Sequence, residues 1–295
     1  MFKSGFVAIV GRPNVGKSTL LNAIAGQKIA IVSNKPQTTR TAIKGIVNRE
    51  DAQIIFTDTP GIHKPKNKLG EKMAETIDEA VSDVDVILYL IEGTDKGIGL
   101  ANEFILNKVI EQNTKAILVI NKVDLVKKEN LLELIKLYSE KHDFEAIIPI
   151  SARNADGIDT VIEKIVELLP EGPAYYDTDE WTDQTERQII EETIREKALR
   201  SLDDEVPHGI AVEVISMKKR DKKELYDIDA TIYCEKKSHK GIIIGKDGSM
   251  LKKIGERARE DIEKMLDSKV NLQLWVKVKE DWRDSETRIN QIFHS

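Results

Sequence analysis

The chain has 295 residues, of which 40% are hydrophobic and 33% are charged, and its formal net charge at pH 7 is −6. This length exceeds that of a usual single domain and predicts two domains. No apolar run approaches the roughly 18 residues needed to span a bilayer, and residues 1–6 lack the apolar core of a secretory signal. We therefore expect neither an integral membrane protein nor an exported one. The single cysteine, Cys234, excludes a disulfide scaffold or a cysteine-rich zinc site and fits a reducing cytosol.

Over the first 170 residues, short apolar runs alternate with amphipathic stretches. This alternation predicts βαβ units and an α/β domain with a mostly parallel sheet flanked by helices. Proline and glycine at 170–173 end the last helical pattern, and the polar stretch that follows predicts a linker. The apolar runs predicted as strands are 6–10, 54–57, 86–91, 116–120 and 147–150.

The order of elements changes after this linker. The order helix, strand, strand, helix, helix, strand, with a short closing helix, predicts a small α+β domain. The predicted elements are a helix at 186–202, strands at 210–215 and 226–233, helices within 240–266 and a strand at 270–276. The predicted domains are 1–172 and 186–295, joined by a linker at 173–185.

A phosphate-binding motif follows the first predicted strand directly. The segment Gly11-Arg12-Pro13-Asn14-Val15-Gly16-Lys17-Ser18 matches G-x-x-x-x-G-K-[ST] in full. In such a loop, backbone N–H groups surround phosphate oxygens, the lysine reaches the β- and γ-phosphates, and the serine hydroxyl binds Mg²⁺. The strand before it and the helical pattern after it disfavour the alternative, a glycine-rich turn that matches by chance. The predicted nucleotide contacts are Gly11, Arg12, Pro13, Asn14, Val15, Gly16, Lys17, Ser18 and Thr19.

The segment Asp58-Thr59-Pro60-Gly61 stands at the end of the second apolar strand and matches D-x-x-G. The Asp58 carboxylate would hold Mg²⁺ through water, and the Gly61 N–H would meet the γ-phosphate. Such tetrapeptides also occur in ordinary turns, which is the alternative here. The position at a strand end, forty residues after Ser18, favours the metal site, and we predict nucleotide contacts from all four residues.

The segment Asn121-Lys122-Val123-Asp124 ends the predicted strand at 116–120. The Asp124 carboxylate would accept hydrogen bonds from the ring N–H and exocyclic amine of guanine, a pair that adenine lacks. Asn121 would hold the loop and the base, and the Lys122 stem would pack on the nucleotide. Ser151 and Ala152 follow the last strand, where the Ala152 N–H would donate to the guanine carbonyl oxygen. The alternative is a polar turn at a strand end.

These motifs, in this order, resemble the GTPase superfamily, and with the second domain they resemble the Era-like family of bacterial ribosome-assembly GTPases. The resemblance implies GTP or GDP and Mg²⁺ as cofactors. It also implies that Gln37-Thr38-Thr39-Arg40 is the first switch, with a threonine that binds Mg²⁺ beside Ser18. We prefer Thr39 as this ligand and keep Thr38 as the alternative. The implied catalytic residues are Lys17, Asn14, Thr39, Asp58 and Gly61.

One position departs from the signalling GTPases. Those proteins carry a glutamine directly after D-x-x-G to orient the attacking water, whereas this chain has Ile62. Isoleucine forms no hydrogen bond, so we predict slow intrinsic hydrolysis. Related GTPases with asparagine in the phosphate loop bind K⁺ near the phosphates. Asn14 therefore predicts a K⁺ ion that supplies positive charge.

Residues 236–259 contain eight basic and two acidic residues, a net charge of +6 within an acidic chain. Inside this window, Gly245-Lys246-Asp247-Gly248 lies between two helical patterns. The segment resembles the G-x-x-G loop over which KH domains clamp about four nucleotides, and the element order resembles a type II KH domain. The alternative is a plain helix connection with water-facing basic residues. The predicted RNA contacts are Ile244, Gly245, Lys246, Asp247, Gly248, Lys252, Lys253 and Arg257.

The closing segment, 274–282, is similar to that of Era-like proteins, so the resemblance covers essentially the whole chain. It implies a GTP-hydrolysing, RNA-binding switch in small ribosomal subunit assembly that binds the 3′ end of the small-subunit rRNA through its KH domain. We expect a cytoplasmic monomer that does not bind DNA, and the family also implies peripheral association with the inner face of the cell membrane. Two alternatives remain: a passive RNA-binding chaperone whose nucleotide site only stabilises the fold, and a signalling or trafficking GTPase without an RNA partner.

Overall fold

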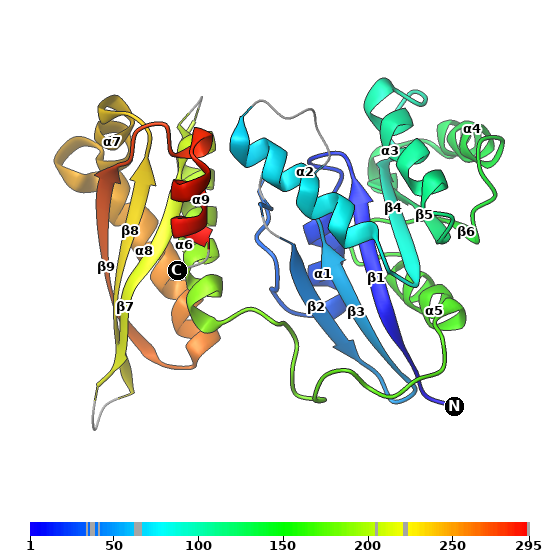
Figure 1. Ribbon diagram of the computed structural model, residues 1–295, viewed down its shortest axis with the longest axis horizontal. Coiled ribbons are helices and arrows are strands. Elements are labelled where there is room, and N and C mark those ends of the chain that lie inside the picture. Colours follow the sequence, from blue (N-terminus) through cyan, green and yellow to red (C-terminus); the bar gives the residue numbers. More distant parts are fainter. Residues whose placement is uncertain are drawn as a thin grey trace. The chain divides into compact units, whose positions relative to one another are not determined.

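The computed structural model describes residues 1–33, 35, 39–40, 42–61, 67–203, 206–220 and 224–293, the last four without their side chains. The chain divides into two compact units. The first is built mainly from residues up to Asp183 and the second mainly from Gln184 onward (Figure 1). The structure thus groups residues 173–183 with the first unit.

The first unit is an α/β domain with helices on both faces of one sheet (Figure 1). Its elements in chain order are β1 (Lys3–Gly11), α1 (Lys17–Ala25), β2 (Ile43–Asn48), β3 (Ala52–Asp58), α2 (Lys68–Val81), β4 (Val86–Glu92), α3 (Leu100–Glu111), β5 (Lys115–Asn121), α4 (Lys128–Ser139), β6 (Ala146–Pro149) and α5 (Ile158–Leu168). The strands lie in the order β2-β3-β1-β4-β5-β6. Strand β2, which we did not predict, is antiparallel to β3, and the other neighbouring pairs are parallel. The mostly parallel sheet is therefore confirmed.

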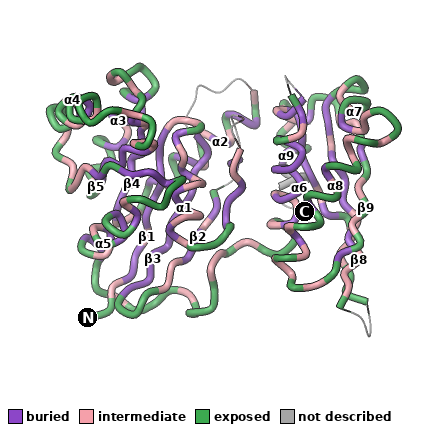
Figure 2. The backbone as a smooth tube through the Cα atoms, turned by 180° about the vertical axis from the view of Figure 1, so that it is seen from behind, coloured by how far each residue is buried: buried purple, intermediate pink, exposed green. Residues whose placement is uncertain are grey.

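Apolar side chains cover both faces of the central strands, as a parallel sheet requires. Ile9 of β1 packs with Leu20 of α1 and Ile165 of α5 on one face. Tyr89 of β4 packs with Tyr138 of α4 on the other. Figure 2 shows buried residues along these strands and exposed ones on the outer sides of the helices. The carboxyl ends of the strands are the edge at which ligands bind in such sheets, and the predicted motifs follow β1, β3, β5 and β6 at that edge.

Residues 173–182, here called the edge segment, run along the hairpin formed by β2 and β3. Gln53 of β3 accepts hydrogen bonds from two successive backbone N–H groups of this segment at 2.7 and 3.0 Å, and it donates to the Tyr176 carbonyl at 2.8 Å. The Ile46 N–H of β2 donates to the Trp181 carbonyl at 3.0 Å. These bonds satisfy backbone groups at the edge of the sheet, where an unpaired strand would otherwise be exposed.

The second unit is a small α+β domain. Its elements are α6 (Glu186–Ser201), β7 (Ala211–Lys219), β8 (Leu225–Cys234), α7 (Lys237–Ile244), α8 (Ser249–Leu266), β9 (Lys269–Val278) and α9 (Glu286–Phe293). Strand β8 lies between its neighbours, antiparallel to β7 and parallel to β9. Helix α6 begins at a capping box between Thr185 and Gln188. The buried Trp282 donates its Nε1–H to the Gly209 carbonyl at 3.0 Å and thereby holds the closing segment.

Glu191 of helix α6 forms a hydrogen bond with strand β7 at an irregularity in its pairing with β8. The pairing of β7 with β8 shifts register directly after Val214, and Glu191 accepts a hydrogen bond from the Val214 N–H at 2.8 Å. Burial is the main cause that raises the pKa of Glu191 to about 7. The carboxylates of Glu192 and Glu213 add to this rise, whereas the Val214 N–H and Arg187 oppose it. Glu191 therefore binds a proton more tightly in the folded chain than in the unfolded chain.

We expect Glu191→Gln to be more stable than the wild type at pH 8. Because the folded-state pKa lies above the ordinary value of 4.5, the contribution of Glu191 to stability is fully present below that value and is lost as the pH rises through about 7. Glutamine stays neutral and still accepts from the Val214 N–H, so the variant avoids this loss, about 1–3 kcal/mol after allowance for partial exposure. Urea unfolding at pH 5 and pH 8 measures the difference, with the exposed Glu260→Gln as control. An unchanged pH dependence in Glu191→Gln would contradict the prediction.

Candidate nucleotide and RNA sites

The phosphate-binding loop connects β1 to α1 and has a backbone shape that its residues specify. Gly16 has a φ of 104°, and a Cβ there would lie 2.2 Å from the Asn121 side-chain nitrogen, so the position requires glycine. Lys17 turns back into the loop, where its Nζ donates to the Gly11 and Arg12 carbonyls, both at 3.0 Å. Burial lowers the pKa of Lys17 to about 8, partly opposed by a nearby carboxylate. The loop thus holds a buried amino group where phosphate oxygens are expected.

Three oxygen-bearing side chains converge beside this loop. The Ser18 hydroxyl donates to Asp58 Oδ2 at 2.7 Å, and Thr39 Oγ1 lies 3.2 Å from both that oxygen and Ser18 Oγ. The second oxygen of Asp58 is buried without a hydrogen-bond partner among the residues that the structure describes. Burial raises the pKa of the Asp58 carboxyl. Two hydroxyls and an unsatisfied carboxylate oxygen fit Mg²⁺, which prefers oxygen ligands. Thr38, the alternative to Thr39, lies outside the described residues.

The segment that follows β3 packs against the phosphate loop. The Thr59 hydroxyl donates to the Ile9 carbonyl of β1 at 2.8 Å. A Cβ on Gly61 would lie 2.7 Å from the backbone of Pro13, so a side chain at position 61 would push the two loops apart. Gly61 is therefore in close contact with the phosphate loop. Ile62 and Gln37 lie outside the described residues, and the roles of the attacking water and the first switch stay predictions.

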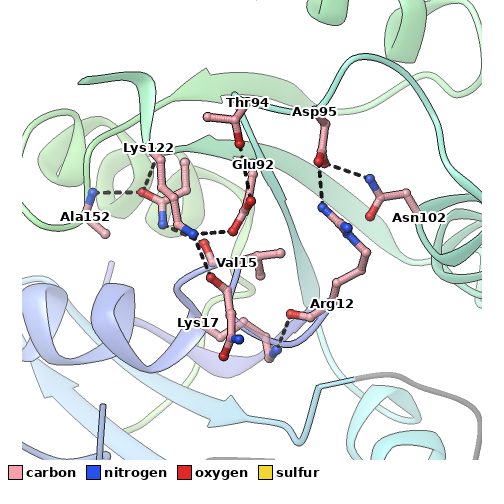
Figure 3. A network of polar contacts seen from close by, with 11 residues as sticks. Arg12, Val15, Lys17, Glu92, Thr94, Asp95, Asn102, Lys122 and Ala152 are labelled. Atoms are coloured by element: carbon pink, nitrogen blue, oxygen red, sulfur yellow. Dashed lines mark hydrogen bonds and ion pairs between the residues drawn. The ribbon is translucent and has the colours of Figure 1, made fainter. Parts of the chain in front are cut away.

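Asn121, at the end of β5, joins three loops through one side chain. Its Nδ2 donates to the Val15 carbonyl at 2.8 Å, and its Oδ1 accepts from the Lys122 and Ala152 N–H groups at 2.8 and 3.0 Å. Figure 3 shows Lys122 and Ala152 beside the residues of the phosphate loop. We predicted that the Ala152 N–H donates to guanine, whereas in this structure it donates to Asn121. The amide of Asn121 thus fixes the loops around the expected base position.

The carboxylate of Asp124 is oriented by a residue that follows β6. The Ser151 hydroxyl donates to Asp124 Oδ1 at 2.6 Å. Sequence reasoning assigned Ser151 no more than a general contact, and the structure shows that it holds the carboxylate proposed to select guanine. Because the two residues follow different strands, their pairing depends on β5 and β6 lying side by side.

Two carboxylates at the carboxyl end of β4 belong to no sequence motif: Glu92, the last residue of the strand, and Asp95, in the loop that follows it (Figure 3). Glu92 forms an ion pair with Lys122, whose Nζ also donates to the Asn14 carbonyl at 2.9 Å. Asp95 Oδ1 lies 2.6 Å from Arg12 Nη2. The side chain of Arg12 thus points to this loop, while its backbone belongs to the phosphate loop. Acidic residues at or just after the end of a parallel strand were the available signal, since such positions reach the shared carboxyl edge of the sheet.

In the second unit, the G-x-x-G segment turns sharply between α7 and α8. Gly245 and Gly248 have φ values of 73° and 77°, and Asp247 also has a positive φ of 51°. A Cβ on Gly245 would lie 2.7 Å from Met250 Cβ, whereas a Cβ on Gly248 would meet nothing within 4 Å. Packing therefore requires the first glycine, and the second leaves the backbone open to a close partner.

Apolar and basic side chains flank this loop. Ile243 is buried in the core, Ile244 is partly buried against it, and Ile242 is 50% exposed. Only the middle isoleucine is thus a full core residue, because one side of a short helix faces the sheet. The predicted phosphate-contacting side chains are exposed: Lys246, Lys252, Lys253 and Arg257.

The fold and these sites define a class of protein in which a P-loop nucleotide-binding domain is joined to a KH domain. Two family models match the same regions of the chain. A model described as "50S ribosome-binding GTPase" matches residues 6–122, and a model described as "KH domain" matches residues 205–283.

Relatives match along almost the whole chain. GTPase Era of Caldicellulosiruptor saccharolyticus is 58% identical over 283 residues, which cover 96% of this chain and 94% of that protein. GTPase Era of Ruminiclostridium cellulolyticum is 54% identical over 291 residues, which cover 99% and 97%. A crystal structure of Era in complex with MgGDPNP and nucleotides 1506–1542 of 16S ribosomal RNA matches with a TM-score of 0.96, 40% identity and full coverage of both chains. A variant of Aquifex aeolicus Era bound to GDP·AlF4⁻ matches equally.

The chain therefore belongs to the Era family of GTPases, which confirms the resemblance predicted from its motifs. It is a GTPase with a carboxyl-terminal KH domain of the RNA-binding type.

Proposed function

We propose that this chain is a GTP-driven RNA-binding switch that acts in small ribosomal subunit assembly. The KH domain binds the 3′ end of the small-subunit rRNA, and the nucleotide on the first unit sets how tightly it does so. The observation that carries the proposal is the presence, in one chain, of converging phosphate, metal and guanine motifs and a G-x-x-G loop with an open glycine. The Era structure that contains both MgGDPNP and nucleotides 1506–1542 of 16S ribosomal RNA supports it.

The first unit would hold GTP for attack by water. Lys17 would exchange its two carbonyl partners for β- and γ-phosphate oxygens, and Asp124 would select guanine. Ser18 and Thr39 would ligate Mg²⁺ directly, and Asp58 would hold it through water. When bound, Mg²⁺ supplies positive charge to the phosphate oxygens. The other proposed nucleotide contacts lie in the segments 11–19, 58–61, 121–124 and 151–152.

The γ-phosphate would be sensed at both ends of the hairpin formed by β2 and β3. Thr39 precedes β2, and Gly61 follows β3, so the hairpin connects the two segments that we propose respond to the γ-phosphate. GTP would hold both ends, and hydrolysis would release them. A switch also requires that the affinity for RNA differs between the GTP and GDP states.

We further propose that K⁺ near Asn14 stimulates hydrolysis. Asn14 has a left-handed φ of 66°, and Lys122 Nζ holds its carbonyl at 2.9 Å. The loop is thus held in a fixed shape beside the expected phosphates. Because Ile62 replaces the water-orienting glutamine of signalling GTPases and forms no hydrogen bond, another group must assist hydrolysis. A fixed cation at this point would stabilise the transition state.

GTP turnover is expected to be about 10-fold faster in K⁺ than in Na⁺ buffer, and to rise further with a 16S rRNA 3′-end fragment. Phosphate release measured in both buffers, with and without the fragment, tests the K⁺ effect and the RNA effect separately. Asn14→Ala should remove the difference between the cations. Asn113→Ala is the matched control, since Asn113 is an exposed asparagine that also has a positive φ. Equal turnover in K⁺ and Na⁺ would refute the cation proposal, and turnover insensitive to RNA would argue against coupling.

The subcellular localisation and the oligomeric state of the protein are also proposed here. We propose a monomer that works at the small ribosomal subunit in the cytoplasm and associates peripherally with the inner face of the membrane. Across the ranges that the structure describes, every helix is too short or too polar to cross a bilayer.

A further inference from the structure

We propose that Asp95 is a positioning residue for GTP hydrolysis. Through Arg12 it fixes the phosphate loop that carries Asn14 and Lys17, and it does not touch the nucleotide itself. The inference rests on the roles proposed above for that loop. It assigns a function to the β4–α3 loop, which the motifs leave out.

Both oxygens of the Asp95 carboxylate are used, and they face different elements. Oδ1 accepts from Arg12 Nη2 of the phosphate loop at 2.6 Å, and Oδ2 accepts from Asn102 Nδ2 of α3 at 2.9 Å (Figure 3). Asn102 is 2% exposed, and its backbone carbonyl accepts a hydrogen bond from the Tyr89 hydroxyl of β4 at 2.9 Å. Arg12 is therefore tied through Asp95 to the buried core between β4 and α3.

The bond to Arg12 reaches the proposed phosphate site through the backbone. The Arg12 carbonyl is one of the two acceptors of Lys17 Nζ. Glu92, the last residue of β4, holds Lys122, which donates to the Asn14 carbonyl. The carboxyl end of β4 and the β4–α3 loop thus brace the phosphate loop at two residues, on either side of the proline that Gly61 contacts.

The bracing acts on a loop with an unusual backbone shape. Asn14 adopts a left-handed φ of 66°, a conformation that asparagine tolerates better than most residues other than glycine and that its surroundings hold in place. The Arg12–Asp95 pair is also unlike an ordinary surface ion pair, since the side chains are only 31% and 16% exposed. Without the charge of the Asp95 carboxylate, the Arg12 guanidinium would pair with another group, and the backbone of the phosphate loop would shift. Displacements on the order of 1 Å can slow a reaction by about 100-fold.

We expect Asp95→Asn to lower kcat about 10-fold or more while the Kd for GDP changes less than about threefold. Arg12→Gln should give the same loss, and the double variant should lose no more than either single one, because both remove one shared interaction. Asp95→Glu keeps the charge and should recover most of the turnover. Glu167→Gln, which breaks a surface pair with Lys164 on α5, is the matched control.

Steady-state kinetics and thermal unfolding on the full chain separate positioning from general destabilisation. An unchanged kcat in Asp95→Asn, losses that multiply in the double variant, or a loss that merely follows a falling Tm would each overturn the inference. The Lys17→Ala variant distinguishes a failure of this inference from a failure of the proposed phosphate site. If Lys17→Ala keeps full turnover, the proposed phosphate site fails, whereas an inactive Lys17→Ala beside a normal Asp95→Asn overturns this inference alone.

Discussion

Multiple-turnover GTP hydrolysis is expected to fall by at least about 100-fold in Lys17→Ala. The amino group is buried and donates to two carbonyls of the phosphate loop, so it lies where the β- and γ-phosphate oxygens are expected. A fixed cation at this point stabilises the charge that develops on the transferred phosphoryl group, and alanine supplies none. Phosphate release at saturating GTP and Mg²⁺ measures the effect.

Lys164→Ala is the matched control, because Lys164 lies on α5 and pairs at the surface with Glu167. Asp58→Ala should also abolish turnover, since Asp58 carries the unsatisfied oxygen at the proposed metal site. If both Lys17→Ala and Asp58→Ala keep turnover, these residues do not form the catalytic site. The nucleotide site would then serve only the fold, as in a passive RNA-binding chaperone.

Binding of a 16S rRNA 3′-end fragment is expected to weaken about 10-fold or more in Gly248→Asp, with GTP turnover unchanged. The backbone at Gly248 lies in open space between exposed basic residues. A side chain there would stand between the loop and the RNA backbone, and its carboxylate would repel the phosphates. Fluorescence titration of a labelled fragment at fixed salt measures the affinity.

Gly248→Asn separates bulk from charge, since asparagine has the same shape and tolerates a positive φ. Gly245→Asp is less informative, because its Cβ would clash with Met250 and disturb α8. Unchanged affinity in both Gly248 variants would favour a signalling or trafficking GTPase without an RNA partner. The titration should also give different affinities with GDP and with a non-cleavable GTP mimic. Identical values would remove the basis for a switch.

The fold class and most of the candidate nucleotide residues could be predicted from the amino-acid sequence. Parallel strands are buried on both faces, so they are recognisable as apolar runs such as 86–91 and 116–120. The phosphate loop and the segments at 58–61 and 121–124 are contiguous, and each follows such a run. Their chemistry is local because a short peptide supplies the backbone shape or the carboxylate. The G-x-x-G loop was recognisable for the same reason, together with the basic charge around it.

The side chains that meet across the loops could not be predicted from the sequence, because these contacts depend on how the strands are arranged in space. The apolar residues of β2 are interrupted by lysine and glycine, and the edge of the strand is completed by the distant edge segment at 173–182. Asp95 reaches Arg12, and Glu92 reaches Lys122, because β4 lies between β1 and β5. Hydrogen bonds and ion pairs between loops depend on the order of strands in the sheet. The local periodicity of a sequence records burial and secondary structure, and it carries no information about that order.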